Sequence, residues 1–146
     1  MNLGLKSYNP PPRPDVSTAA ARLAELDVFP GASKTDLKKI ALTGHLVTVP
    51  AGWTLMAEST PADKAYVVLR GQVAVKHGQD EFARLGEGEL VGEMAIVHRH
   101  LRNATAVAAT DLEALHLTKE AVEQLCESVP AFRAVVERTA TDRAAA

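Results

Sequence analysis

The stretch G-E-G-E-L-V-G-E-M-A-I-V-H-R-H-L-R-N-A-T-A-V, residues 86–107, decides the fold and the site of this chain. Gly92 has no Cβ, so the backbone there can approach a ligand closely. Residues 93–97 predict one helical turn directly after it, and a helix start exposes unpaired N–H groups that suit an anion. Arg102 follows ten residues after Gly92. A loop that returned Arg102 to the helix start would form a phosphate cradle, in which Glu93 accepts from a sugar hydroxyl. The alternative is a glycine turn followed by a surface arginine.

Short strands are predicted on both sides of this stretch. Hydrophobic and polar residues alternate there, and glycine, proline or aspartate ends the runs. Short strands at nearly even spacing are typical of a sandwich or a barrel. They are predicted at residues 47–49, 66–69, 73–75, 82–85, 105–108 and 112–115.

Two short helices are predicted before the strands. Ser17 is the expected N-cap of the first, which should stop near Pro30–Gly31. Ser33 begins the second, in a capping-box pattern with Asp36 at the third position.

Helices are also predicted after the strands. Thr118 is the expected cap of the first, and Pro130 should break or restart it. Phe132, Val135 and Val136 then line one face of a final helix. Helices at both ends with a block of strands between them favour the α+β class.

The composition predicts one folded domain. The chain has 146 residues, of which 47% are hydrophobic and 23% are charged, and its formal net charge is −2. That charge argues against a protein dedicated to coating DNA or RNA, so no nucleic-acid partner is expected. The single cysteine, Cys126, excludes an internal disulfide and a cysteine-rich zinc site. There is neither an apolar run of membrane-spanning length nor an apolar signal core, so we expect a cytoplasmic protein without a membrane partner.

The stretch at residues 86–107 resembles the phosphate-binding cassette of the cyclic nucleotide-binding domain family. That cassette reads F-G-E-[LM]-A-L and then, at a fixed spacing, R-[AST]-A-[TS]-V. Here V-G-E-M-A-I spans residues 91–96 and R-N-A-T-A-V spans residues 102–107. The interval from Gly92 to Arg102 matches the common spacing without a gap.

The resemblance extends over nearly the whole chain, from about Ala20 to Arg143. P-A-G at 50–52 and T-P-A-D-K-A-Y-V-V-L-R-G-Q-V-A-V at 60–75 are similar to the family's upstream pattern. We therefore expect residues 17–146 to form the cyclic nucleotide-binding domain. Residues 1–16, which contain four prolines, are expected to be an extended segment; a ligand for an aromatic groove is the less favoured interpretation.

The resemblance implies an eight-stranded β-roll, a double-stranded β-helix of the jelly-roll kind, flanked by N- and C-terminal helices. It implies that Arg102 pairs with the cyclic phosphate of a 3′,5′-cyclic nucleotide and that Glu93 accepts from the ribose 2′-hydroxyl. A final helix, roughly residues 131–143, would cover the base, with Thr139 and Thr141 as polar candidates. The predicted ligand-binding residues are Gly92, Glu93, Met94, Ala95, Arg102, Asn103, Ala104 and Thr105.

Three positions depart from the family's pattern. Val91 replaces the usual phenylalanine, and Ser59 stands where the family often has glycine. Asn103 replaces alanine, serine or threonine. A threonine or serine directly after the arginine is often linked to cGMP, so Asn103 favours cAMP.

The favoured hypothesis is a cyclic nucleotide sensor, for cAMP with cGMP as the other candidate, without catalytic residues, metal or cofactor. Its output would be a partner protein or self-association. A second hypothesis is an interaction module that kept the roll and lost nucleotide binding. A third is a small metalloenzyme, for which His98-x-His100 could begin a metal site. The lone Trp53 is predicted to pack against the protein rather than to stack on a base.

Overall fold

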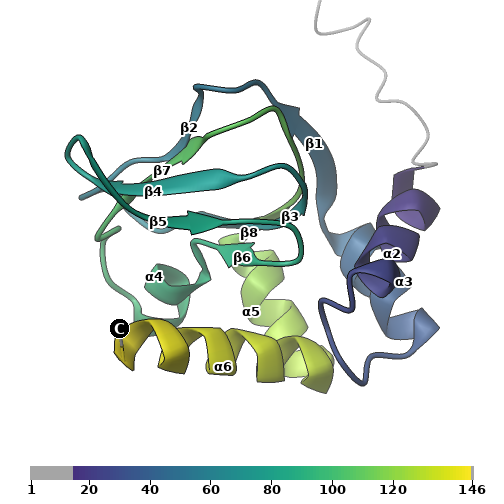
Figure 1. Cartoon of the computed structure of the whole chain (residues 1–146). Helices are drawn as coiled ribbons and strands as arrows, with labels where there is room; N and C mark the ends of the chain where they lie inside the picture. The colour runs from purple at the N-terminus through teal and green to yellow at the C-terminus, as the bar shows by residue number, and fades with distance from the viewer. Residues whose placement is uncertain (1–14, 146) are drawn as a thin grey trace, which may run out of the picture.

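The computed structural model describes residues 15–145, with side chains described from Val16 to Thr139. Within these residues, eight strands in two antiparallel sheets are flanked by helices at both ends (Figure 1). In chain order the elements are α2 (Asp15–Glu25), α3 (Lys34–Thr43), β1 (His45–Val49), β2 (Thr54–Met56), β3 (Lys64–Arg70), β4 (Val73–His77), β5 (Asp80–Leu85), β6 (Leu90–Val91), α4 (Glu93–His98), β7 (Thr105–Ala108), β8 (Leu112–Thr118), α5 (Lys119–Ser128) and α6 (Pro130–Ala145).

The two sheets each contain four strands, in the orders β1-β8-β3-β6 and β2-β7-β4-β5. Apart from the hairpin of β4 and β5, the paired strands are not consecutive in the sequence, as in the pairing of His45 with His116. This arrangement confirms the predicted β-roll of the α+β class. It also means that the fold depends on long-range pairing rather than on hairpins alone.

Two hydrophobic clusters hold the layers together, and β3 contributes to both. Val67 and Leu69 face the helices, where they join a cluster containing Leu125 and Phe132. Val68 faces the second sheet and joins the other cluster. A strand buried on both faces is continuously hydrophobic, which explains the run Ala65–Leu69.

The helical caps follow the predicted chemistry. Ser33 and Asp36 form a reciprocal capping box at the start of α3. Thr118 accepts a hydrogen bond from the backbone N–H of Ala121 at the start of α5. Pro130 begins α6, because proline at a first helical position loses no backbone hydrogen bond.

The first helix differs from the prediction at both ends. It begins at Asp15, so Ser17 lies inside the helix and is not its N-cap. It ends at Glu25, before the predicted stop near Pro30, because Asp27 adopts a left-handed conformation with φ of 49°. After this turn, Val28 and Phe29 are buried in the hydrophobic cluster that also contains Leu125 and Phe132. Of the segment predicted over residues 1–16, only Asp15 and Val16 lie within the described residues, and both are helical.

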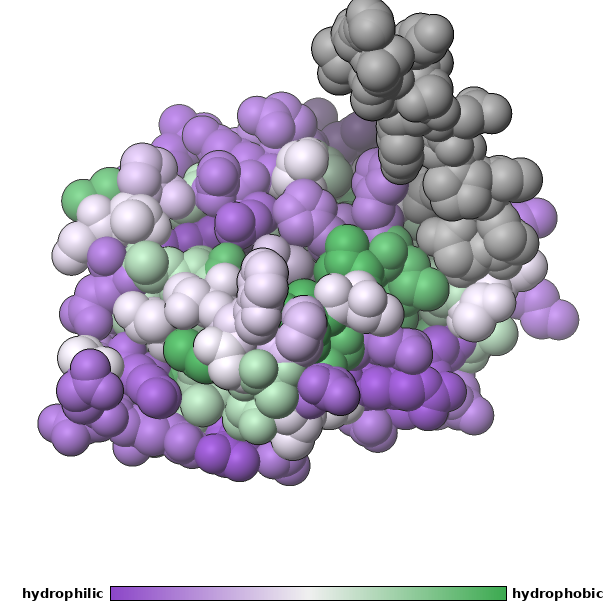
Figure 2. Space-filling view, turned by 90° about the horizontal axis from the view of Figure 1, so that it is seen from above, coloured by the Kyte–Doolittle hydropathy of each residue, from purple (hydrophilic) through white to green (hydrophobic). Residues whose placement is uncertain are grey.

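Trp53 is 65% exposed, so it lies outside the core. Its backbone N–H donates to the carbonyl oxygen of Pro50 in the turn before β2. In the view from above, hydrophobic residues gather near the middle of the visible face and hydrophilic residues surround them (Figure 2). None of the described helices has the length and apolar character needed to cross a membrane.

Candidate functional site

Gly92 is the N-cap of α4, which begins at Glu93 as the sequence predicts. Its φ is 90°, a conformation that residues with a side chain rarely adopt. A Cβ there would lie 2.7 Å from Cε of Met56 and 2.8 Å from Nη1 of Arg102. The backbone conformation therefore favours glycine, and any larger residue would displace the ends of the Met56 and Arg102 side chains.

Arg102 is buried, with 4% of its surface exposed. Its Nη1 donates to the carbonyl oxygen of Gly92 and its Nη2 to that of Lys64. The backbone of Arg102 is held as well: its N–H donates to Thr60 and its carbonyl oxygen accepts from Ser59. The loop after β2 therefore holds Arg102 beside the start of α4.

Ser59 has φ of 66°, in the left-handed region. Glycine adopts this conformation without strain, which gives a physical reason for the glycine that the family often has there.

The charge of Arg102 is only partly compensated by the protein. Burial lowers the pKa of its guanidinium, while the negative charges of Asp63 and Glu93 act to raise that pKa. Its two terminal nitrogens donate to neutral carbonyl oxygens, and its Nε, also buried, has no hydrogen-bond partner among the described residues. A buried cation with an unused donor favours binding of an anion, because an anion can both neutralise the positive charge and accept a hydrogen bond.

Arg102 lines a cavity of about 740 Å³ between the strands and α6. Six of the eight predicted ligand-binding residues line it: Gly92, Met94, Ala95, Arg102, Asn103 and Ala104. Glu93 is not among the lining residues. It is fully buried between Gly92 and Met94 in the sequence, and its negative charge acts to raise the pKa of Arg102. Thr105 is not among the lining residues; its hydroxyl accepts from the backbone N–H of Glu58 instead.

The final helix contributes Val135, Arg138 and Thr139 to the same cavity. Thr139 was a predicted candidate, whereas the side chain of Thr141 lies outside the described residues. The lining residues of β2, β4 and β5 were not predicted from the sequence. Alternation along β4 could have identified Val75 and His77, because these residues share a face with buried Val73.

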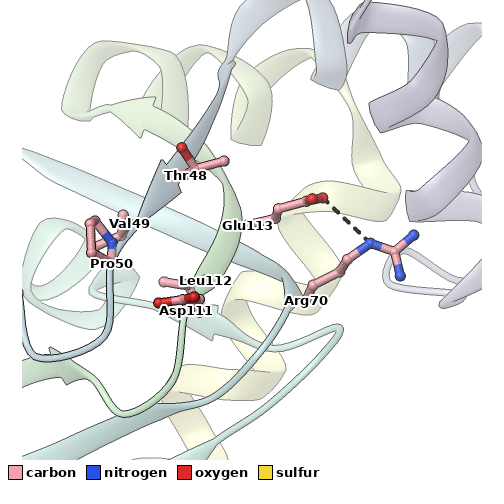
Figure 3. Close-up of a pocket in the computed structure, with 7 residues that line it drawn as sticks. All are labelled: Thr48, Val49, Pro50, Arg70, Asp111, Leu112 and Glu113. Carbon is pink, nitrogen blue, oxygen red and sulfur yellow. Dashed lines mark ion pairs between the residues drawn. The ribbon is translucent and has the colours of Figure 1, made fainter.

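A second, smaller pocket of about 490 Å³ lies at the ends of β1, β3 and β8 (Figure 3). It contains an ion pair, with Nε of Arg70 3.4 Å from Oε1 of Glu113, and both side chains are about half exposed. Because its charges already pair with each other and are solvated, this pocket lacks the uncompensated cation of the larger one.

His98, the last residue of α4, and His100, which follows the helix, are the candidate start of a metal site; both are exposed, with ring centroids 6.0 Å apart. Among the described residues, no group of three or more histidine, cysteine, aspartate or glutamate side chains is arranged to hold a metal ion.

The fold resembles solved structures of regulatory proteins. The catabolite activator protein of Thermus thermophilus is 26% identical with a TM-score of 0.70, over 80% of this chain and 57% of that one. The regulatory subunit of a cAMP-independent protein kinase A from Trypanosoma brucei has a TM-score of 0.76 at 19% identity, over 86% of this chain and 46% of that one. Since the second protein is cAMP-independent, the shared fold does not by itself specify the ligand.

The chain is also similar to known proteins in its amino-acid sequence. A cyclic nucleotide-gated potassium channel of Mesorhizobium japonicum is 34% identical over 96 residues, which make up 66% of this chain and 26% of the channel. This chain therefore spans about a quarter of that relative. The family description that matches residues 46–129, more than half of the chain, is that of the cyclic nucleotide-binding domain. The chain belongs to the cyclic nucleotide-binding domain family.

Proposed function

We propose that this domain binds a 3′,5′-cyclic nucleotide, with cAMP preferred over cGMP, and acts as a regulatory sensor without catalysis of its own. The observation that carries the proposal is the buried side chain of Arg102: this residue lines the cavity, and its Nε has no hydrogen-bond partner among the described residues. A cyclic phosphate carries one negative charge and two free oxygens, which match the paired donors of an arginine.

In the proposed complex, each part of the site has one role. Arg102 binds the phosphate, together with backbone N–H groups at the start of α4 beside Gly92. Glu93 accepts a hydrogen bond from the ribose 2′-hydroxyl, which orients the sugar. Asn103 stands where the family's threonine or serine is linked to cGMP, and this supports cAMP as the preferred ligand.

The sensor function follows from the position of α6. Val135, Arg138 and Thr139 of this helix line the same cavity as Arg102, so one ligand can contact both the roll and the helix. A ligand shifts a conformational equilibrium only if it contacts the two states differently, and α6 supplies such a difference. The output is then a partner protein or self-association that senses the position of α6.

Calorimetric titration with cAMP and cGMP at one salt concentration tests the proposal. We expect saturable one-to-one binding, and we expect Arg102→Ala to weaken it by on the order of 2–5 kcal/mol, as for one partner of a buried charge pair. Arg70→Ala is the matched control, because Arg70 is 59% exposed and lies in the other pocket. Absence of binding to either nucleotide up to millimolar concentration would instead support an interaction module on the same fold.

A further inference from the structure

The two sheets of the described residues have four edge strands, and three of them are protected against pairing with another chain. β6 contains only two residues, and β2 contains three and pairs irregularly with β7. β5 carries Asp80, Glu81 and Arg84, and it has a bulge at which Phe82 has no partner in the register with β4. Short length, charged side chains and bulges are features by which edge strands avoid pairing with other chains.

The fourth edge strand, β1, lacks these features. Its five residues, His45–Val49, include no acidic residue, lysine, arginine or proline, and they pair with β8 in one continuous register. Within residues 15–145, β1 pairs with no other strand. A strand that is paired on one side presents backbone N–H and C=O groups on the other. Valine and threonine, which favour strands, occupy three of the five positions, so β1 is suited to pair with a further strand.

Two exposed hydrophobic side chains flank β1. Leu42, three residues before the strand, is 57% exposed, and Trp53, four residues after it, is 65% exposed. The helix that contains Leu42, α3, leads into one end of β1, and the connection to β2, which contains Trp53, leaves from the other end (Figure 1). A single exposed hydrophobic residue is common on protein surfaces. One at each end of the unprotected strand instead indicates an interface that includes the strand.

We infer that two copies of this chain associate through β1, by antiparallel pairing of β1 with the same strand of the second copy. A two-fold axis at Val47 would place this residue opposite its counterpart, and His45 opposite Val49 of the second copy. Because antiparallel strands run in opposite directions, the end that carries Leu42 meets the end that carries Trp53 in the other copy. The two apolar side chains then cover each other at both ends of the paired strands.

The arrangement of these residues favours a second copy over an unrelated partner. A two-fold axis brings the same surface of both copies together, so one strand with a different apolar residue at each end is complementary to itself. An unrelated strand would have to carry its own pair of apolar residues at this spacing. The two four-stranded sheets would join into one continuous sheet. This inference goes beyond the proposed function, because the contact involves neither the nucleotide cavity nor α6.

Analytical ultracentrifugation of the full chain without nucleotide, from micromolar to millimolar concentration, tests the inference. Five paired residues and two apolar contacts form a small interface, so we expect monomers in dilute solution and dimers as the concentration rises. Trp53→Ala should weaken the dimer at least about tenfold, because each dimer loses two aromatic contacts. Leu101→Ala is the control and should leave the dimer unchanged, since Leu101 is 56% exposed but lies after α4, outside β1 and its flanking segments.

Crosslinking through introduced cysteines tests the register. The background is Cys126→Ser, which removes the single native thiol. With Val47→Cys, the two new thiols face each other across the axis, with Cβ atoms about 5 Å apart, and should form a disulfide-linked dimer on oxidation. Val49→Cys is the matched control: Val47 and Val49 are both half-buried and share a face of β1. The two copies of residue 49 would be four residues apart along the strands, about 13 Å, so this variant should not crosslink.

Thermal melting reports whether each variant folds, and the exposure of Trp53 leads us to expect that Trp53→Ala does. A wild-type protein that stays monomeric at millimolar concentration would overturn the inference. A dimer that Trp53→Ala does not weaken, or equal crosslinking of the two cysteine variants, would overturn it as well, because the contact would then lie elsewhere. These measurements contain no nucleotide. Failure of the dimer therefore leaves the proposed function standing, and failure to bind a cyclic nucleotide leaves the dimer standing.

Discussion

Nη1 of Arg102 donates a hydrogen bond to the carbonyl oxygen of Gly92, the residue ten positions earlier that caps α4. This bond closes the segment between them into a loop that contains the whole helix. The cation and the backbone N–H groups of the helix start are thereby held close together. A ligand anion that binds there would meet both at once, and disturbance of either residue should affect the other.

Substitution Gly92→Ala should reduce both stability and cyclic nucleotide affinity. A Cβ at this position would overlap Met56 and Arg102, at 2.7 and 2.8 Å. Gly52→Ala is a matched control: its φ is 92°, but no atom lies within 4 Å of the added Cβ. Both variants should lose about 1–2 kcal/mol of folding free energy to backbone strain, and Gly92→Ala a further 1–3 kcal/mol to overpacking. Denaturant unfolding and cAMP titration check this, and equal losses in the two variants would contradict it.

Substitution Glu93→Gln should reduce the discrimination between cAMP and its 2′-deoxy analogue. A hydrogen bond to a charged group contributes about 1.5–3 kcal/mol, so the wild type should bind the deoxy analogue at least about tenfold more weakly. The variant keeps only a neutral amide oxygen as the acceptor, so its preference for cAMP should be clearly smaller.

Competition binding with the two nucleotides measures this difference. Glu123→Gln, an exposed position on α5, is the control and should behave like the wild type. If Glu93→Gln keeps the full preference for cAMP while remaining folded, Glu93 does not bind the 2′-hydroxyl.

Substitution Leu125→Ala should destabilise the fold far more than Leu42→Ala. Leu125 is fully buried in the cluster between the helices and the first sheet, whereas Leu42 is 57% exposed. Truncation of a buried leucine removes apolar burial and leaves a cavity, at a cost of about 2–5 kcal/mol. The same truncation at an exposed position costs about 0.5 kcal/mol or less. Chemical denaturation of both variants compares the two values, and similar losses would show that this cluster is not close-packed.

The stability of the domain should fall as the pH decreases below about 6.5, in part because of His116. Burial, followed by the positive charges of Lys64 and His45, lowers the pKa of this imidazole. The unfolded chain therefore binds a proton more readily than the folded one, so stability from this group is fully present above the unfolded pKa. It is lost as the pH falls toward the folded pKa. We expect His116→Gln to flatten the dependence of the melting temperature on pH between about 7.5 and 5.5.

His98→Gln is the control for this measurement, because His98 is exposed at the end of α4. It should retain the dependence on pH of the wild type. A His116→Gln variant with an unchanged pH profile would show that other groups dominate the acid response.

Several elements could be predicted from local signals alone. The capping box of Ser33 and Asp36 needs only residues within one helical turn, and it forms as predicted. The helix at Glu93 follows from the glycine before it, and β7 has the predicted bounds, Thr105–Ala108. Such signals do not depend on the remainder of the chain.

Two strands could not be located in this way. β6 contains only Leu90 and Val91, which is too short for any alternation to be recognised. β2 pairs irregularly with β7, with a register shift between Thr54 and Met56. Both elements exist because a partner strand supplies their hydrogen bonds, so they depend on tertiary pairing.

The sequence by itself determined the class of the fold, the N-caps of α3 and α5 and the segment from Gly92 to Arg102, because short-range spacing carries these features. Only the tertiary structure decided that Arg102 is buried with an unused donor and that Phe82 reaches the cavity. Burial depends on every layer packed around a residue, and the direction of Phe82 depends on a bulge in the pairing of β4 with β5. No short segment of the sequence predicts either feature, because both depend on the register that strands adopt when distant segments of the chain pair.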